Sequence, residues 1–140
     1  MFRQSAVKPL TAALIFLFFA IMLVSCTQEN SGNGKEVYMK ITPEQAKEFM
    51  EHQKDCVILD VRTQEEFDAG HIPGAILIPD YEITAKAEAI LPDKEQLILV
   101  YCRSGRRSLN AAEELAAIGY TNVKEFGGIL NWPYETVSEN

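Results

Sequence analysis

Short, continuous apolar runs alternate with stretches of helical pattern along most of this chain. The clearest runs are residues 56–59 (CVIL) and residues 97–101 (LILVY), each with the length of a single strand. Such unbroken runs are typical of strands that are buried on both faces, and strands that alternate with helices favour parallel pairing. We therefore expect an α/β domain with a mainly parallel central sheet and helices on both faces.

Local signals indicate where the individual elements begin. Thr42 followed by Pro43 predicts a helix start, and Thr63 with Glu66 three residues later forms a capping box for a second, short helix. The other expected strands are residues 37–41, 75–78 and 123–126, and the other expected helices are residues 81–91 and 107–118.

The N-terminal part of the chain has the pattern of a targeting segment. Arg3 and Lys8 precede an uncharged apolar run over residues 10–24, which suits a signal peptide and is short for a membrane-spanning helix. Residues 23–26 (LVSC) resemble the bacterial lipobox, in which cleavage occurs before a cysteine that is then acylated. We expect residues 1–25 to be a lipoprotein signal peptide and Cys26 to be the site of lipid attachment; an uncleaved N-terminal anchor is the alternative.

These expectations divide the chain into three parts. After the signal peptide, residues 26–36 form a lipidated, flexible linker, since positions 27–36 are polar throughout. Residues 37–138 then form one folded domain. Lipid on Cys26 would anchor this domain to a bacterial membrane outside the cytoplasm.

The balance of charge is acidic except in one short loop. The formal net charge of -7 argues against nucleic acid as a partner. The exception is residues 102–108 (CRSGRRS), which contain three arginines within five positions. An anionic substrate or intermediate explains this basic loop most directly.

Cys102 directly follows the strongest predicted strand and precedes a predicted helix. Ligands of parallel sheets bind at the carboxyl ends of strands, where the loop amides and the helix N-terminus favour anions. The same groups lower the pKa of a thiol, and Gly105 permits a backbone conformation that other residues avoid. We predict that Cys102 is an accessible, reactive thiolate; the alternative is a structural cysteine beside a solvated basic turn.

Three separate stretches resemble the rhodanese family of sulfurtransferases. Residues 59–75 (LDVRTQEEFDAGHIPGA) are similar to its first signature, residues 101–108 (YCRSGRRS) to its active-site loop, and residues 127–132 (GGILNW) to its C-terminal signature. One departure is Leu77, which stands where the family often has asparagine. The resemblance implies the rhodanese-like fold.

The resemblance also implies an enzyme of the thiosulfate sulfurtransferase type. Cys102 would take sulfur from a small anionic donor such as thiosulfate and pass it, as a persulfide, to a thiol or cyanide acceptor. The amides of residues 103–107 would hold the persulfide's charge, Arg103 and Arg106 would attract the donor, and Arg107 would shape the loop's positive field. No metal or organic cofactor is implied, and we expect a monomer.

Two other interpretations of the loop stay open. One is a rhodanese-like module without catalysis that binds a partner or senses redox state through Cys102. The other is a relative of the phosphatases and arsenate reductases, which carry five residues between the cysteine and the arginine. The shorter spacing from Cys102 to Arg107 favours sulfur transfer.

Several neighbouring residues have expected supporting roles. The hydroxyls of Ser104 and Ser108 either donate to the bound anion or cap the helix. Asp60 and Arg62 are expected to support the site structurally, by pairing with each other or with the backbone near the active-site loop, because a carboxylate at the end of a central strand needs a partner.

Two further residues are expected to be unreactive. Cys56 opens an apolar strand and is predicted to be an inert core thiol; a disulfide with Cys102 would abolish the nucleophile and is not expected. His71 is predicted to fix its loop by a hydrogen bond rather than to act as a base.

Overall fold

The strands of the described part of the chain form one sheet in which every pair is parallel, in the order β1-β5-β4-β2-β3. The structure is a computed structural model and describes residues 38–138. The strands are β1 (Tyr38–Lys40), β2 (Val57–Asp60), β3 (Ile76–Leu77), β4 (Ile98–Cys102) and β5 (Val123–Gly128). The helices are α2 (Pro43–His52), α3 (Gln64–Ala69), α4 (Ile83–Ile90) and α5 (Arg106–Ala117), with short 3-10 turns η1 (Asp80–Glu82) and η2 (Ile129–Asn131). The expected parallel α/β architecture is confirmed.

Two helices, α2 and α3, begin where the capping signals predicted. The Thr42 side chain accepts a hydrogen bond from the Gln45 N–H at 3.2 Å, and Thr63 accepts one from the Glu66 N–H at 3.3 Å. These bonds satisfy amide groups that have no partner within the first helical turn, so they fix the starts of α2 and α3.

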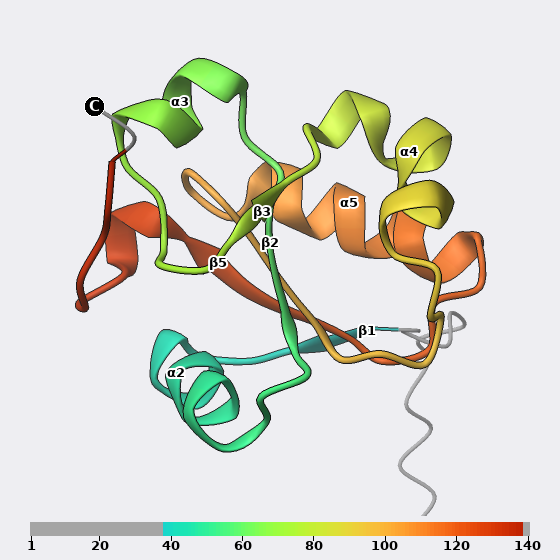
Figure 1. The fold of residues 1–140 in the computed structure, drawn as a ribbon, viewed down its shortest axis with the longest axis horizontal. Coiled ribbons are helices and arrows are strands. Elements are labelled where there is room, and N and C mark those ends of the chain that lie inside the picture. The colour runs from blue at the N-terminus through green and yellow to red at the C-terminus, as the bar shows by residue number, and fades with distance from the viewer. Residues whose placement is uncertain (1–37, 139–140) are drawn as a thin grey trace, which may run out of the picture. The chain divides into compact units, whose positions relative to one another are not determined.

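Two apolar clusters occupy the two faces of the sheet. One packs α4 and α5 against the sheet through residues such as Leu59, Val100 and Leu115, and the other lies under α2 around Leu99 and Phe126. Figure 1 shows α5 and α4 on one side of the strands and α2 on the other. All of β4 is buried at the centre of the sheet, and a fully buried Leu or Val side chain contributes about 1.5–3 kcal/mol.

Some predicted elements are shorter than expected. The strand predicted at residues 75–78 is shorter in the structure, where β3 covers Ile76–Leu77. The helix predicted at residues 81–91 is divided between η1 and α4. No helix within residues 38–138 is long and apolar enough to cross a membrane. The predicted signal peptide, linker and Cys26 lie outside the described residues.

Candidate active site

Cys102 is the last residue of β4, at the carboxyl edge of the sheet, and α5 begins at Arg106. Gly105 between them has a φ of +104°, the left-handed conformation that a side chain disfavours. In this conformation the Gly105 N–H donates a hydrogen bond to Cys102 Sγ at 3.0 Å. The loop therefore directs a backbone donor at the sulfur.

The pKa of Cys102 is set by two opposing influences. Burial acts to raise this pKa, but hydrogen bonds from the hydroxyl and amide of Ser108 and from the amides of Gly105 and Ser104 outweigh it and lower the pKa below its usual value. Ser108 lies outside the stretch 103–107 that was predicted to supply the amides. Cys102 is 1% exposed, so the prediction of an accessible thiol is wrong for this conformation.

The burial of Cys102 follows from close packing between the loop and the end of β5. A Cβ atom on Gly128 would lie 2.2 Å from the Arg103 carbonyl oxygen and 2.5 Å from the Ser104 Cα. Only glycine fits at that distance, so Gly128 permits this approach of the two backbones. The Leu130 N–H also donates to the Arg103 carbonyl at 3.2 Å. These contacts hold the loop against the end of β5.

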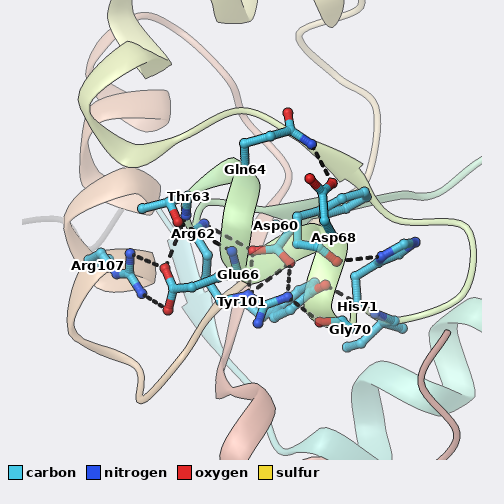
Figure 2. A network of polar contacts seen from close by, with 12 residues as sticks. Asp60, Arg62, Thr63, Gln64, Glu66, Asp68, Gly70, His71, Tyr101 and Arg107 are labelled. Carbon is cyan, nitrogen blue, oxygen red and sulfur yellow. Dashed lines mark hydrogen bonds and ion pairs between the residues drawn. The ribbon is translucent and has the colours of Figure 1, made fainter. Parts of the chain in front are cut away.

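The three arginines of the loop differ in their contacts. Arg107 forms a bidentate ion pair with Glu66, with both N–O distances 2.8 Å (Figure 2). This pairing raises the pKa of Arg107 and lowers that of Glu66 to about 2. Arg103 and Arg106 are exposed and form no ion pair with any residue in the range 38–138. The uncompensated positive charge therefore comes from these two side chains.

Glu66 connects two helices at this edge of the sheet. Its Oε2 accepts a hydrogen bond from the Thr63 N–H at 3.1 Å, which completes the capping box of α3. The same carboxylate binds Arg107 in the first turn of α5. The capping role was predictable from local spacing, whereas the ion pair joins residues 41 positions apart and has no local signal.

Asp60 and Arg62 form a buried pair with each other, one of the two arrangements that the sequence left open. Arg62 Nη2 lies 2.6 Å from Asp60 Oδ2, with Asp60 fully buried and Arg62 5% exposed. Arg62 Nη2 also donates to the Gly70 carbonyl at 2.7 Å, and the nearby Tyr101 hydroxyl accepts from the Ile72 N–H at 3.1 Å (Figure 2). These bonds connect the ends of β2 and β4 to the segment after α3.

Sequence reasoning missed Glu125 on β5. This carboxylate is 5% exposed, and its Oε1 accepts hydrogen bonds from Ser108 Oγ at 2.6 Å and from the Gly127 N–H at 2.8 Å. Ser108 is fully buried, and neither it nor Ser104 caps α5, whose N-cap residue Gly105 makes no side-chain cap. The available signal was an acid inside a strand pattern, two positions before the paired glycines.

Cys56 lies at the opposite edge of the sheet from Cys102. Because Val57 pairs with Ile98 in parallel register, Cys56 lies level with Leu97, and Cys102, five residues beyond Leu97, is roughly 16 Å further along the strand direction. Disulfides need Cα atoms within about 7 Å, which explains why both cysteines are free. Burial raises the pKa of Cys56, although its side chain is only partly buried.

His71 has the contacts of a loop-fixing residue. Its Nδ1 lies 2.9 Å from the Phe67 carbonyl oxygen, and its ring stacks on the Phe67 ring. Its backbone pairs with Val137 near the end of the described chain. Within residues 38–138, no group of three or more His, Cys, Asp or Glu side chains is arranged to hold a metal ion.

Known proteins are similar to this chain across the region that contains the loop. Residues 42–134 match the family described as the rhodanese-like domain. The chain is 41% identical over 71 residues to thiosulfate sulfurtransferase PspE of Escherichia coli, which covers 51% of the chain and 68% of PspE. It is 33% identical over 94 residues to a sulfurtransferase of Allochromatium vinosum, which covers 66% of the chain and 86% of that protein.

Solved structures of other proteins have the same fold as this chain. A rhodanese with anions from Escherichia coli superposes with a TM-score of 0.56 at 36% identity, covering 59% of this chain and 98% of that one. A rhodanese-related protein from Thermoplasma volcanium superposes with a TM-score of 0.64 at 33% identity, covering 73% of this chain and 100% of that one.

Proposed function

This chain belongs to the rhodanese-like domain family, and from that premise we propose that it is a sulfurtransferase that carries sulfane sulfur on Cys102. The observation that carries the proposal is the Gly105 amide directed at Cys102 Sγ, 3.0 Å away, in a loop that lowers the pKa of this thiol. The sulfurtransferase names of two similar proteins support it.

The first half of the proposed reaction loads the enzyme. The Cys102 thiolate attacks the outer sulfur of thiosulfate, a bond forms between that sulfur and Sγ, and sulfite leaves with the electron pair of the broken S–S bond. Exposed Arg103 and Arg106 attract the anionic donor. The amides of residues 103–107, with that of Ser108, then stabilise the negative terminal sulfur.

The second half returns the enzyme to its starting state. A thiolate or cyanide attacks the outer sulfur of the persulfide, and Sγ leaves as the thiolate that the loop stabilises. Because Cys102 is 1% exposed, the residues that cover it must move aside for each transfer. No metal or organic cofactor takes part in these steps.

The site favours sulfur transfer over the two other interpretations. A lowered pKa makes Cys102 a nucleophile, which a module that only binds a partner does not need. The phosphatases carry their arginine after five intervening residues, and that position here is Ser108; Arg107, one position earlier, is held in a bidentate pair with Glu66. Mixed disulfides on Cys102 without sulfur transfer would support the redox-sensing module instead.

Transfer of sulfur from thiosulfate to cyanide tests the proposal. We expect Cys102→Ser to lower the rate by at least about 10³-fold, because the variant has no nucleophile. Cys56→Ser is the matched control and should keep the rate within about twofold, as surface and scaffold changes usually do. Circular dichroism should show both variants folded. Transfer that survives in a folded Cys102→Ser variant would contradict the proposal.

We further propose that lipid on Cys26 anchors the catalytic domain, residues 37–138, to a bacterial membrane outside the cytoplasm, as a monomer. The support is the apolar run at residues 10–24 and the lipobox-like residues 23–26. In a bacterial host, the wild-type protein should incorporate labelled palmitate and sediment with membranes. Equal labelling of a Cys26→Ser variant would refute this assignment.

A further inference from the structure

The pairing of β5 with β4 shifts its register beside Cys102. Val100 pairs with Glu125, but Cys102, two residues further along β4, pairs with Gly128, three residues further along β5. The extra residue makes this shift a β-bulge, a feature that is common beside active sites because it redirects the groups around it. In an unshifted register Cys102 would pair with Gly127. The bulge therefore decides which backbone lies beside the thiol.

The side chain of Glu125 binds this bulge. Its Oε1 accepts a hydrogen bond from the Gly127 N–H, two positions along the same strand, at 2.8 Å. Gly127 has a φ of +92°, the left-handed conformation that accommodates the extra residue. The side chain of Glu125 is 5% exposed, so few water molecules are available to replace this bond. Glu125 therefore stabilises the conformation on which the shifted register depends.

The same carboxyl oxygen also binds the start of α5. Glu125 Oε1 accepts a hydrogen bond at 2.6 Å from Ser108 Oγ, and Ser108 is fully buried in the first turn of α5. Ser108 Oγ also lies 2.9 Å from the carbonyl oxygen of Gly105, the N-cap residue. One oxygen atom thus joins the bulge of β5 to the first turn of α5, across 17 positions of sequence.

The loop between β4 and α5 packs against the bulge. A Cβ atom on Gly105 would lie 3.6 Å from the Gly127 Cα, and a Cβ atom on Gly128 would lie 2.2 Å from the Arg103 carbonyl oxygen. Gly105, which lies against the bulge in this way, also donates its N–H to Cys102 Sγ at 3.0 Å. A displaced bulge would therefore move this donor relative to the sulfur.

We propose that Glu125 is a positioning residue for Cys102: it fixes the bulge of β5 against the first turn of α5 and so keeps the Gly105 N–H directed at Sγ. It acts by accepting two hydrogen bonds, and its own protonation state does not have to change. The inference rests on the proposed function only in treating Cys102 as the residue that carries sulfur.

The test is the rate of alkylation of Cys102 by iodoacetamide across pH in the full-length protein, read on the Cys102 peptide by mass spectrometry. Glu125→Met has a similar length, but its sulfur is only a weak acceptor. Its alkylation midpoint should rise by about one pH unit, because the thiolate loses a well-directed donor. Glu125→Gln keeps an oxygen that accepts from Gly127 and Ser108, so it should keep the wild-type midpoint.

Tyr120→Phe is the control for a loss of stability alone. Tyr120 is fully buried beyond the far end of α5 from the loop, and its hydroxyl donates to the Leu91 carbonyl at 2.6 Å. The variant loses a buried hydrogen bond and should keep the wild-type midpoint. If Glu125→Met does not fold, Glu125→Asp decides the question. Its side chain is one methylene too short to hold both Gly127 and Ser108, so its midpoint should also rise.

A wild-type midpoint in folded Glu125→Met, or an equal rise in Glu125→Gln, would overturn the positioning role. A lower midpoint in both variants would also overturn it, because removing a negative charge near a thiol lowers the pKa of that thiol. Alkylation needs no sulfur donor, so these outcomes are separate from failure of the proposed function. A protein that transfers sulfur with equal midpoints in all variants would keep its function and lose the positioning role.

Discussion

The two edges of one parallel sheet give two free thiols opposite properties. Cys102 at the carboxyl edge has a lowered pKa, whereas burial raises the pKa of Cys56 at the amino edge. Cys102 is the more buried of the two, so burial alone would predict the reverse order. The difference comes from the donors that the β4–α5 loop directs at one sulfur.

Space alone does not make a reactive site in this fold. A groove of about 680 Å³ lies at the amino edge, lined in part by His52, Cys56 and Asp93. The pKa of its thiol, Cys56, is raised, so this thiol is held in the neutral form. Parallel strands bring loops that lead into helix N-termini to the carboxyl edge only, and there the amides are available to an anion.

Among variants that keep both thiols, the largest effect should come from a change that displaces the loop at the carboxyl edge. In Gly128→Ala the new Cβ collides with the Arg103 carbonyl, which displaces the loop from Cys102. A misplacement of about 1 Å can cost about 10²-fold in rate, so we expect a loss of that order in thiosulfate:cyanide transfer. The pKa of Cys102, followed by alkylation, should rise toward the behaviour of Cys56.

Gly74→Ala is the matched control for this prediction. Gly74 also has a positive φ, +79°, but an added Cβ meets no atom within 4 Å. The variant should therefore lose about 1–3 kcal/mol of stability from backbone strain and keep its rate of transfer. Equal rates in Gly74→Ala and Gly128→Ala would show that loop packing does not create the contrast between the thiols.

A smaller effect, on stability, should come from breaking the ion pair between Glu66 and Arg107 at the carboxyl edge of the sheet. Glu66→Gln removes the bond to Arg107 and should lower the free energy of unfolding by about 1 kcal/mol at neutral pH. The folded pKa of Glu66 is about 2, below its usual 4.5. The stabilisation is therefore complete above about pH 4.5 and is lost as pH falls toward 2.

Urea unfolding of wild type and Glu66→Gln at several pH values checks this prediction. The difference between their unfolding free energies should shrink across that acidic range. The control Glu51→Gln breaks the exposed pair with Lys47 and should change stability less. A difference between wild type and Glu66→Gln that stays constant down to pH 2 would argue that the pair contributes nothing.

The elements of the fold were predictable because their signals are local. Apolar runs located β2 and β4, and the capping residues Thr42 and Thr63 located two helix starts. The position of Cys102 between a buried strand and a helix was also readable from neighbouring residues. Such features depend on spacing of a few positions.

The parts of the site that were missed depend on contacts between distant segments. The sequence pattern does not state that β5 lies beside β4, and this order brings Glu125 to Ser108. The same order presses Gly128 against the loop, which buries Cys102 where an accessible thiol was expected. Sheet order is set by packing of the whole domain, so it cannot be predicted from local periodicity.

The central claim is that sulfur is carried on Cys102 and not on Cys56. Mass spectrometry of the purified protein after treatment with thiosulfate tests it directly. We predict a gain of about 32 Da, one sulfur atom, on the Cys102 peptide, which cyanide then removes, and no gain on the Cys56 peptide. An unmodified Cys102, or sulfur found on Cys56, would contradict the claim.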